Sequence, residues 1–345
     1  MTIVKASPWL TIAVLVALLV GAGMMALALG SVSVPLQEIV TLLLHQLHVT
    51  DDGGWTSTHA AVILQVRLPR VLMAGLVGGG LALSGTVMQG IFHNPMADPG
   101  LLGVSSGAAL GAVLTLHLSL ATQHYLLLPA LAFLGGLMAA ATVYGMATSG
   151  GKTPVATLLL SGIAVSSFNV ALTSFVLSIS RESVLREILF WLMGGLEAST
   201  WEHVRLSAPI VLVGAAVVCL FARDLDILLY GEQRALTLGV DAQRCRHLLL
   251  FLATALTAVV VCFSGTVGFV GLVVPHMLRL LVGPGHQRLL PASFLGGATF
   301  LVLADLTARV LVRPQELRLG VITAFVGVPF FLYLLRANRR ILEPL

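Results

Sequence analysis

The stretch SGGKTP at 149–154 contains residue types of a nucleotide-binding loop. Such a loop needs the pattern G-x-x-x-x-G-K-[ST], in which backbone N–H groups surround the phosphates and the lysine reaches them. Gly151, Lys152 and Thr153 fit, but the first glycine would have to stand where the sequence has Met146. An apolar, membrane-type segment precedes the stretch, whereas a phosphate loop follows a strand. We interpret 149–154 as a short loop with one basic residue, and we expect no ATP site on this chain.

No arrangement of nucleophiles, bases or metal ligands in the sequence is typical of an enzyme. An intramembrane protease would need paired Asp residues, a Ser–His pair within the membrane, or the motif His-Glu-x-x-His. His45 and His48 are three residues apart without a glutamate, and the three cysteines form no close pair: Cys219, Cys245 and Cys262. We therefore expect no catalytic residue, no metal site and no cofactor bound to this chain.

Carboxylates are also scarce where a membrane carrier would use them. A proton- or sodium-driven carrier usually keeps an ionisable residue at mid-membrane. Only Asp98, in a proline-rich turn, and Asp305, toward the end of an apolar segment, come close to such a position. The sequence therefore predicts that the driving force for any transport comes from another chain, which disfavours a stand-alone secondary carrier.

A charged segment, LDILLYGEQRALTLGVDAQRCRH at 225–247, separates two strongly apolar blocks. Gly231 and Gly239 permit tight turns, so the segment is predicted to form short helices. It combines three polar residues with four leucines: Glu232, Gln233, Arg234, Leu228, Leu229, Leu236 and Leu238. An ordinary solvated loop would not need so many leucines. We expect the segment to bury an apolar surface against a partner chain.

The composition places the rest of the chain in a lipid bilayer. Hydrophobic residues make up 57% of the 345 residues and charged residues only 10%, whereas soluble domains carry roughly 25% charged residues. The net charge of +4 is small for this length. Basic residues at membrane ends explain it better than a nucleic-acid-binding surface does, so we expect no nucleic-acid partner.

Apolar stretches of about 20 residues predict ten membrane spans. Their approximate limits are 9–29, 71–89, 101–120, 125–147, 154–179, 206–222, 248–264, 266–282, 291–312 and 319–335. The first is too long for a signal-peptide core and is interpreted as an uncleaved anchor. An even number of spans puts both termini on one side. The chain is thus predicted to be all-α and polytopic, with 1–345 forming a single membrane domain.

The distribution of Lys and Arg orients the spans. With both termini inside, eleven of the nineteen basic residues fall on the inner side and eight on the outer side, which agrees with the positive-inside tendency. The segment 225–247 is then cytoplasmic. Arg67, Arg70 and Arg309 lie on the outer side, where that tendency disfavours them. Something must therefore compensate for these three arginines.

Small residues predict how the spans pack. Gly103, Gly107 and Gly111 recur every fourth residue, and Gly75 and Gly79 have the same spacing. In lipid, such glycines let helices approach closely, and packing within one subunit is favoured over a dimer contact. The tetrapeptide SGTV occurs at 84–87 and again at 264–267, near opposite membrane faces. That placement is compatible with an inverted internal repeat.

Several motifs together resemble the FecCD family of ABC importer permeases. They are RLPR at 67–70, SGTVMQGIFHNPMADPGLLGVSSGAALGA at 84–112, FWLMGGL at 190–196, GFVGLVVPHMLRLLVG at 268–283 and LGVITAFVGVPFFLYLL at 319–335. The resemblance implies a type II ABC importer permease fold with ten helices and a homodimer enclosing the pathway. It also implies two cytoplasmic ATPase subunits that bind ATP and Mg²⁺, a periplasmic binding protein, and a location in the bacterial inner membrane with both termini cytoplasmic.

The resemblance also assigns roles to particular residues. YGEQRALTLGV at 230–240 resembles the cytoplasmic coupling loop that contacts the ATPase, which points to Gly231, Glu232, Arg234, Ala235, Leu238 and Gly239. Arg67, Arg70 and Arg309 match arginines that meet glutamates of the binding protein. A guanidinium suits that task because it stays charged and binds carboxylates bidentately. Alternatively, the three arginines pair with local acids such as Asp305 or Glu316, or extend to lipid head groups.

The transported molecule is the least defined part of the prediction. Ser167, Ser174 and Ser178 share one helical face, with Asn169 and Thr173 nearby, and this stripe either lines the pathway or returns hydrogen bonds to its own helix. It lacks a ligand set for a bare ion, so a large chelate is expected. Overall likeness within the family favours haem; a ferric siderophore or cobalamin is the alternative. A receptor or scaffold without transport is the alternative from another class.

Overall fold

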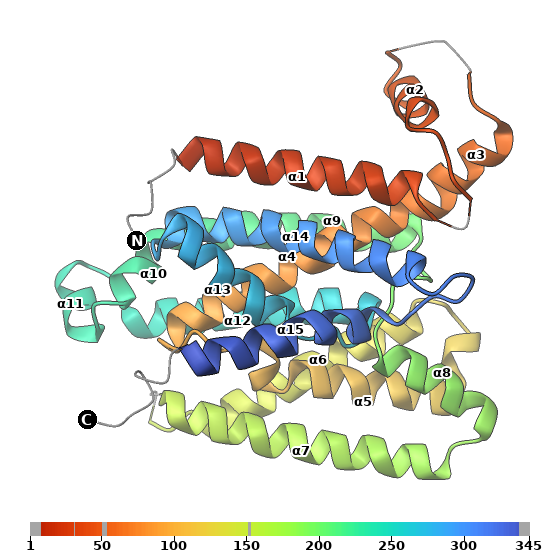
Figure 1. The fold of residues 1–345 in the computed structure, drawn as a ribbon. Helices are drawn as coiled ribbons and strands as arrows, with labels where there is room; N and C mark the ends of the chain where they lie inside the picture. Colours follow the sequence, from red (N-terminus) through yellow and green to blue (C-terminus); the bar gives the residue numbers. More distant parts are fainter. Residues whose placement is uncertain (1–7, 31, 50–53, 151–152, 338–345) are drawn as a thin grey trace.

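The structure, a computed structural model, describes residues 8–30, 32–49, 54–150 and 153–337 and is almost entirely helical (Figure 1). The elements are α1 (Pro8–Ala28), α2 (Leu36–Gln46), α3 (Ser57–Ala61), η1 (Val62–Arg67), α4 (Leu68–Ile91), η2 (Pro99–Leu102), α5 (Val104–His117), η3 (Leu120–Thr122), α6 (Leu127–Ala147), α7 (Val155–Ile179), α8 (Glu182–Leu192), α9 (Trp201–Leu220), α10 (Ala222–Leu228), α11 (Glu232–Thr237), α12 (Ala242–Ser264), α13 (Val270–Val282), α14 (His286–Val310) and α15 (Leu319–Ala337). The long helices run side by side. We call the end that holds α10 and α11 the α11 end, and the opposite end the α2 end.

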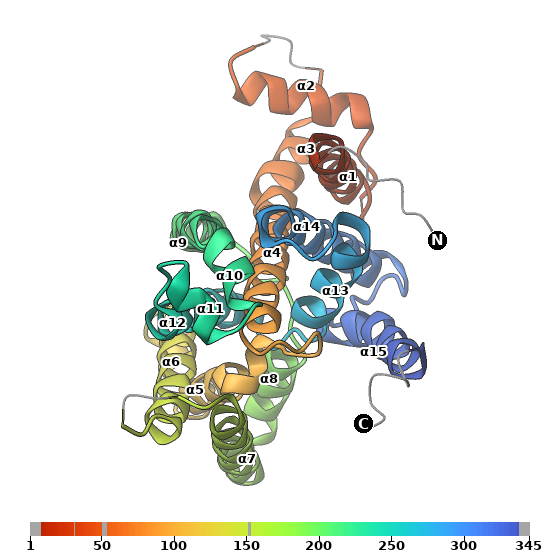
Figure 2. The same ribbon diagram turned by 90° about the vertical axis from the view of Figure 1, so that its left-hand side faces the viewer.

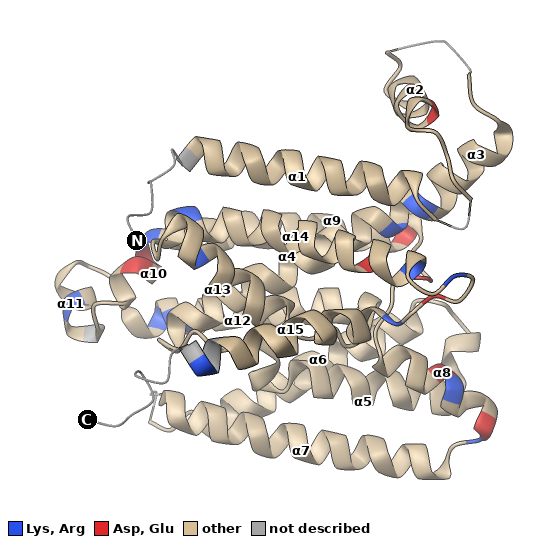
Figure 3. Cartoon of the chain, in the orientation of Figure 1, with Lys and Arg blue, Asp and Glu red and all other residues tan. Residues whose placement is uncertain are grey.

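The ten predicted spans correspond to ten helices of this bundle. In the described part of the chain, seven helices are long and apolar enough to cross a membrane, and three apolar helices are shorter: α5, α13 and α15. α1 begins and α15 finishes at the α11 end, as an even number of crossings requires (Figure 1). Lys, Arg, Asp and Glu gather at the two ends, and the middle of the bundle is nearly free of them (Figure 3). This distribution is the one that a bilayer imposes on a spanning protein.

The second span departs from the prediction at its start. We predict it to begin near 71, but α3, η1 and α4 form one continuous helical stretch from Ser57 to Ile91. Pro69 lies just inside α4, after the π-helical turn η1. Proline has no N–H to donate, and the altered hydrogen bonding of a π turn accommodates it without ending the helix.

Helix α4 is the centre of the bundle, with α14, α13, α12 and α9 around it (Figure 2). Its closest neighbour is α14: a Cβ added to Gly78 would lie 2.1 Å from the carbonyl oxygen of Gly297, and one added to Gly297 would lie 2.3 Å from that of Gly78. The expected close approach therefore exists, through Gly78 and Gly79 but not Gly75: a Cβ on Gly79 would lie 2.8 Å from the Phe294 ring of α14. A Cβ on Gly75 would meet only Ala298 Cβ, at 3.9 Å.

The glycines of α5 pack against α6 of the same chain, which confirms packing within one subunit. A Cβ on Gly107 would lie 2.3 Å from the carbonyl oxygen of Gly135, and one on Gly111 would lie 2.2 Å from that of Leu131. Gly103 faces α6 less closely, since a Cβ there would lie 3.7 Å from Ala139 Cβ, an ordinary van der Waals contact. It precedes α5 with a left-handed φ of 77° and forms the N-cap of the helix.

Two half-length helices, α5 and α13, begin inside the bundle. In Figure 1, α13 extends toward the α11 end, whereas α5 lies toward the end that holds α8. Each is preceded by a left-handed residue, Gly103 (φ 77°) or Phe269 (φ 68°). This opposite placement agrees with the antiparallel relation that the two SGTV copies predict.

The turn before α5 carries a carboxylate deep into the bundle. A Cβ on Gly271, in the first turn of α13, would lie 2.9 Å from the carbonyl oxygen of Leu81 and 3.3 Å from a carboxylate oxygen of Asp98. Leu81 stands ten residues before the end of α4, which corresponds to roughly 15 Å of helix. Asp98 thus lies deeper than its place in a turn predicts, because the chain after α4 folds back beside α13.

Candidate functional site

Three regions of the bundle contain the residues that the sequence singles out or that surround a cavity. One is a cluster of charged side chains near the α2 end. The second is the pair of short helices at the α11 end. The third is an apolar cavity between them, beside α15. The first and third are built from segments that are far apart in the sequence, whereas α10 and α11 are consecutive.

The charged cluster joins α4, α14 and the segment that follows α14. Arg70 Nε donates to both carboxylate oxygens of Asp305, at 2.9 and 3.1 Å, and Arg70 Nη1 contacts Glu316 at 2.8 Å. Arg309 Nε donates to Asp305 at 3.0 Å from one turn further along α14. Asp305 is 2% exposed. Such a buried carboxylate is compatible with an apolar environment because two guanidinium groups neutralise it and occupy its lone pairs.

Arg67 and Arg309 also bind the C-terminal end of α1. Arg67 Nη1 donates to the carbonyl oxygens of Leu27 and Ala28, at 2.6 and 3.3 Å, and Nη2 donates to that of Val32. Arg309 donates to the carbonyl oxygens of two residues in the same turn, Ala26 and Leu29. The last carbonyls of a helix have no partner within it and carry partial negative charge, so cations stabilise them. The two arginines therefore attach α1 to the bundle.

The three arginines that we expect to dock a binding protein are thus occupied inside the chain. Arg67, Arg70 and Arg309 are 4%, 8% and 7% exposed, and the alternative that they pair with Asp305 or Glu316 describes Arg70 and Arg309. These internal partners compensate for the position of the three arginines on the side that the positive-inside tendency disfavours. Docking through the three arginines stays a prediction. Arg313, in the exposed turn after α14, is one of several exposed cations of this end, together with Arg181, Arg186 and Arg205.

At the α11 end, the segment 225–247 forms short helices as predicted. Gly231 (φ 95°) and Gly239 (φ 79°) flank α11, and the left-handed backbone at both positions favours glycine. Ala235 is buried, whereas Leu236 and Leu238 are 65% and 58% exposed. Arg234 is exposed as well. The segment therefore presents apolar side chains away from its own bundle.

Leu228 and Tyr230 change the composition of the apolar surface expected on this segment. Leu228, which we group with the leucines available to a partner, is 4% exposed and lies inside the bundle; its carbonyl oxygen contacts His93 Nε2 at 3.2 Å. Tyr230 is 67% exposed and takes its place on the apolar surface. Glu232 begins α11, but its side chain lies outside the described residues.

The polar residues of α7 do not form one surface. Ser167, Ser174 and Ser178 are exposed, and the hydroxyls of the last two donate to carbonyl oxygens of their own helix, at 2.9 and 2.7 Å. Asn169 is buried and donates to Ser106 Oγ of α5 at 3.3 Å. Thr173 is buried too. The stripe is therefore divided between an outward face and the contact with α5, because these two residues lie on the other side of the helix.

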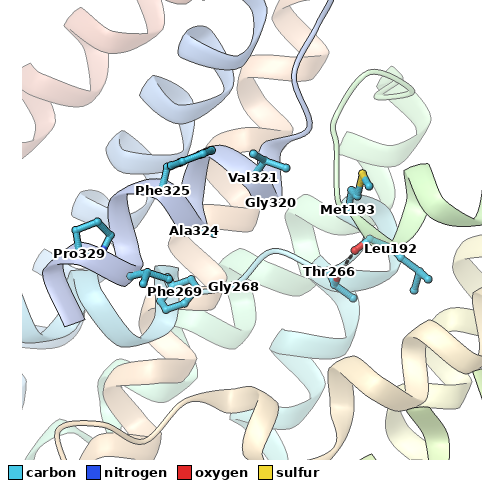
Figure 4. A pocket seen from close by; sticks show the side chains of 11 residues that line it. Leu192, Met193, Thr266, Gly268, Phe269, Gly320, Val321, Ala324, Phe325 and Pro329 are labelled. Carbon is cyan, nitrogen blue, oxygen red and sulfur yellow. Dashed lines mark hydrogen bonds between the residues drawn. The ribbon is translucent and has the colours of Figure 1, made fainter. Parts of the chain in front are cut away.

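A cavity of about 620 Å³ lies between the end of α8, the segment before α13, and α15 (Figure 4). Met193, Phe269, Val321, Phe325 and Val328 are among its lining residues. Thr266 is its one hydroxyl-bearing residue, and that hydroxyl donates to the carbonyl oxygen of Leu192. The side chains that line the cavity are therefore apolar or aromatic, apart from the Met193 thioether and the Thr266 hydroxyl.

Phe269 fixes one wall of the cavity. Its backbone is left-handed, which is costly for a residue with a side chain. Its ring packs on α15: a Cβ added to Gly327 would lie 2.3 Å from Phe269 Cγ. The neighbouring wall is held by backbone hydrogen bonds from Leu319 to Gly194 and from Gly320 to Met193, at 3.1 and 3.0 Å.

Sequence reasoning missed this cavity. Its residues come from the motifs around 190–196, 268–283 and 319–335, which we use only for the family resemblance. No spacing within one segment could reveal it, since α8, the segment before α13 and α15 meet only in the fold. The left-handed Phe269 after Gly268 is likewise a feature of the backbone that the residue types do not predict.

Comparison with known proteins gives consistent results. A profile of the FecCD transport family matches residues 16–337. The chain is 46% identical to the cobalamin import system permease protein BtuC of Halobacterium salinarum, over 90% of this chain and 87% of that one. It is 39% identical to the hemin transport system permease protein HmuU of Yersinia pestis, over 84% and 86%. A solved metal-chelate type ABC transporter in an inward-facing conformation superimposes with a TM-score of 0.83 at 34% identity, over 94% of this chain and 98% of that one.

Proposed function

Because this chain belongs to the FecCD transport family of ABC importer permeases, we propose that it carries a tetrapyrrole chelate, cobalamin or haem, across the membrane. Permeases of this family import iron chelates, haem or cobalamin. The sequence alone favours haem. The 46% identity to a cobalamin permease, against 39% to a hemin permease, favours cobalamin as the first candidate and haem as the second.

The cavity beside α15 supports a large, partly apolar cargo. Met193, Phe269 and Phe325 present a thioether and two aromatic rings, and cavity residues carry no charge. A bare metal ion would need oxygen, nitrogen or thiolate ligands, whereas the flat face of a macrocycle needs apolar contact. In this proposal the cavity is part of the pathway, and a second copy of the chain facing α15 encloses it. The serines on the exposed face of α7 are proposed to lie along the same pathway.

The main support for a contact with ATPase subunits is the exposed apolar surface of the α10–α11 segment. Tyr230, Leu236 and Leu238 are each more than half exposed at the α11 end, one of the two ends where charged residues gather. We propose that two ATPase subunits cover this surface in the homodimer, with Glu232 and Arg234 as polar contacts. The α11 end is then cytoplasmic, both termini are cytoplasmic, and the α2 end faces the periplasm of a bacterial inner membrane.

A periplasmic binding protein is proposed to dock at the α2 end. Arg67, Arg70 and Arg309 hold α1, α4 and α14 together beneath this surface, and the exposed Arg313, just beyond α14, is proposed as a first contact. ATP and Mg²⁺ belong to the ATPase subunits in this proposal, and the permease contributes no group to hydrolysis.

The test is reconstitution of the permease with its ATPase and binding protein in proteoliposomes. Uptake of cobalamin, haem and a ferric siderophore is measured separately, each presented on the binding protein, with and without ATP. The proposal expects ATP-dependent uptake of cobalamin or haem and little uptake of the siderophore. Uptake without ATP, or uptake of the siderophore alone, contradicts it.

Arg234→Glu tests the ATPase contact in the same assay. Uptake is expected to fall, because the reversed charge stands on the surface that the ATPase covers. Arg288→Glu is the matched control, an exposed arginine at the same end of the bundle. Equal uptake by the two variants would argue against the α10–α11 segment as the contact.

A further inference from the structure

The α10–α11 segment is attached to the membrane helices by a carboxylate–imidazole pair. Asp226 Oδ1, on α10, accepts hydrogen bonds from the backbone N–H of His286 at 2.8 Å and from His286 Nδ1 at 2.7 Å. His286 is the first residue of α14 and is 1% exposed. One carboxylate oxygen thus caps α14 and holds the side chain of its first residue.

The other side of the imidazole lies against α4. His286 Nε2 is buried and has no hydrogen-bond partner among the described residues. A Cβ added to Gly90 would lie 2.8 Å from this nitrogen and 3.3 Å from Leu225 Cδ2 of α10. Only a glycine leaves room for the ring at this point, so the imidazole fills the space between α10, α14 and the last turn of α4.

The two helices that meet at this ring also contact one another further along. Gly78 of α4 touches Gly297 of α14 near the middle of the helices. Arg70 of α4 pairs with Asp305 of α14 near the α2 end. The pair α4–α14 is therefore fastened at three levels. At the first level His286, Asp226 and Leu225 join it to the α10–α11 segment, beside the contact of His93 Nε2 with the carbonyl oxygen of Leu228.

We propose that Asp226 and His286 are positioning residues that transmit displacement of the α10–α11 segment to α4 and α14. This inference rests on the proposed function, because it takes the ATPase to move that segment. A hydrogen-bonded pair seated against helix backbone is a stiff connection. A displacement of α10 then moves the start of α14 and the end of α4 together, instead of being absorbed by a loop.

The test measures the ratio of substrate uptake to ATP hydrolysis in the reconstituted complex, together with the melting temperature of each variant. His286→Ala removes the ring. Gly90→Ala leaves both partners in place but displaces the ring from its other side. A coupling contribution typically changes a linked equilibrium about five-fold or more. We therefore expect uptake per ATP to fall by at least about that factor in both variants, while basal ATP hydrolysis is retained.

Three matched variants separate this role from a structural one. Gly75→Ala adds the same methyl group to α4 where it meets only Ala298 Cβ at 3.9 Å, and uptake per ATP should equal that of the parent. Asp224→Asn removes a charge from α10 two residues from Asp226, and is also expected to have no effect. His286→Asn can place its amide nitrogen near the position of Nδ1 and donate to Asp226, so it should recover part of the loss.

The outcomes are distinct. Unchanged uptake per ATP in Gly90→Ala and His286→Ala, with only a lower melting temperature, would overturn the proposal and leave Asp226 as a helix cap. If His286→Ala does not fold, Gly90→Ala decides by itself. Failure of the parent complex to show ATP-dependent uptake would instead count against the proposed function. The variants would then be compared by how far the binding protein stimulates ATP hydrolysis above its basal rate. The proposal expects Gly90→Ala to lower this stimulation while the basal rate is retained.

Discussion

Arg70 on α4 and Asp305 on α14 form a bidentate ion pair inside the bundle, although 235 positions separate them in the sequence. Asp305 also forms an ion pair with Arg309, so one carboxylate is shared by two guanidinium groups. Removing one partner from a buried pair leaves an uncompensated charge, which costs about 3–5 kcal/mol in soluble proteins. The contribution of these arginines to stability can therefore be measured separately from any contribution to docking.

Arg70→Met should lower the melting temperature of the detergent-purified permease, because Glu316 and Asp305 both lose a partner. Arg313→Met, an exposed arginine at the same end, should leave the melting temperature unchanged. Thermal unfolding of the two variants measures the difference. Equal melting temperatures would show that the Arg70 pair contributes nothing to stability.

Docking of the binding protein should depend on salt, because it involves exposed charges separated by solvent. Arg313→Glu should weaken docking and reduce its salt dependence while the fold is kept. The triple substitution of Arg67, Arg70 and Arg309 by glutamate should also abolish docking, but together with loss of stability. Titration of the permease onto surface-bound binding protein at several salt concentrations gives the docking affinity and its salt dependence. A triple variant that is stable and docks like the parent would remove the whole cluster from the interface.

Gly107→Ala should destabilise the contact between α5 and α6. Its Cβ would lie 2.3 Å from the carbonyl oxygen of Gly135, so the helices must move apart and lose van der Waals contact, at a cost of about 1–3 kcal/mol. Gly145→Ala on α6 is the control, because no atom lies within 4 Å of the added Cβ. Melting temperature and yield should fall for the first variant alone. A stable Gly107→Ala protein would mean that α6 adjusts at little cost.

Reversal of two charges in the coupling segment should separate hydrolysis from transport. Glu232→Arg combined with Arg234→Glu alters the surface that we propose the ATPase covers, and Arg234 makes no contribution to the buried core because it is exposed. The dimer should form as before, and ATP should be hydrolysed without uptake. Size-exclusion chromatography and proteoliposome uptake are the measurements. Transport at the parent rate would exclude both residues from coupling.

Phe325→Ala should slow uptake without changing the fold. Phe325 is 74% exposed on the wall of the cavity beside α15, so it contributes little to packing within the chain. Phe251→Ala is the matched control: that ring is 63% exposed on α12, at a different cavity. The rate of substrate uptake is measured for both. A loss that is equal in the two variants would indicate a general effect on the membrane domain and not a role for this cavity.

The sequence determined the features that follow from composition and local pattern. Apolar length predicts the ten spans, since a bilayer tolerates few charges within a helix. Gly231 and Gly239 predict the turns around α11, because a left-handed backbone favours glycine wherever it occurs. Gly107 and Gly111 predict a close helix contact because helices in lipid associate through small residues. None of these inferences needs a distant partner.

The tertiary structure decided everything that depends on which helices meet. A helix that is apolar all round carries no pattern that tells its buried face from its exposed face, so Asn169 could not be placed against α5, nor Gly78 against Gly297. Arg67 could not be assigned to the carbonyl oxygens at the end of α1, because hydrogen bonds across the bundle leave no local signal. For the same reason Asp226 is one acid among several in the sequence, and becomes the link between α10 and α14 only where the fold brings His286 to it.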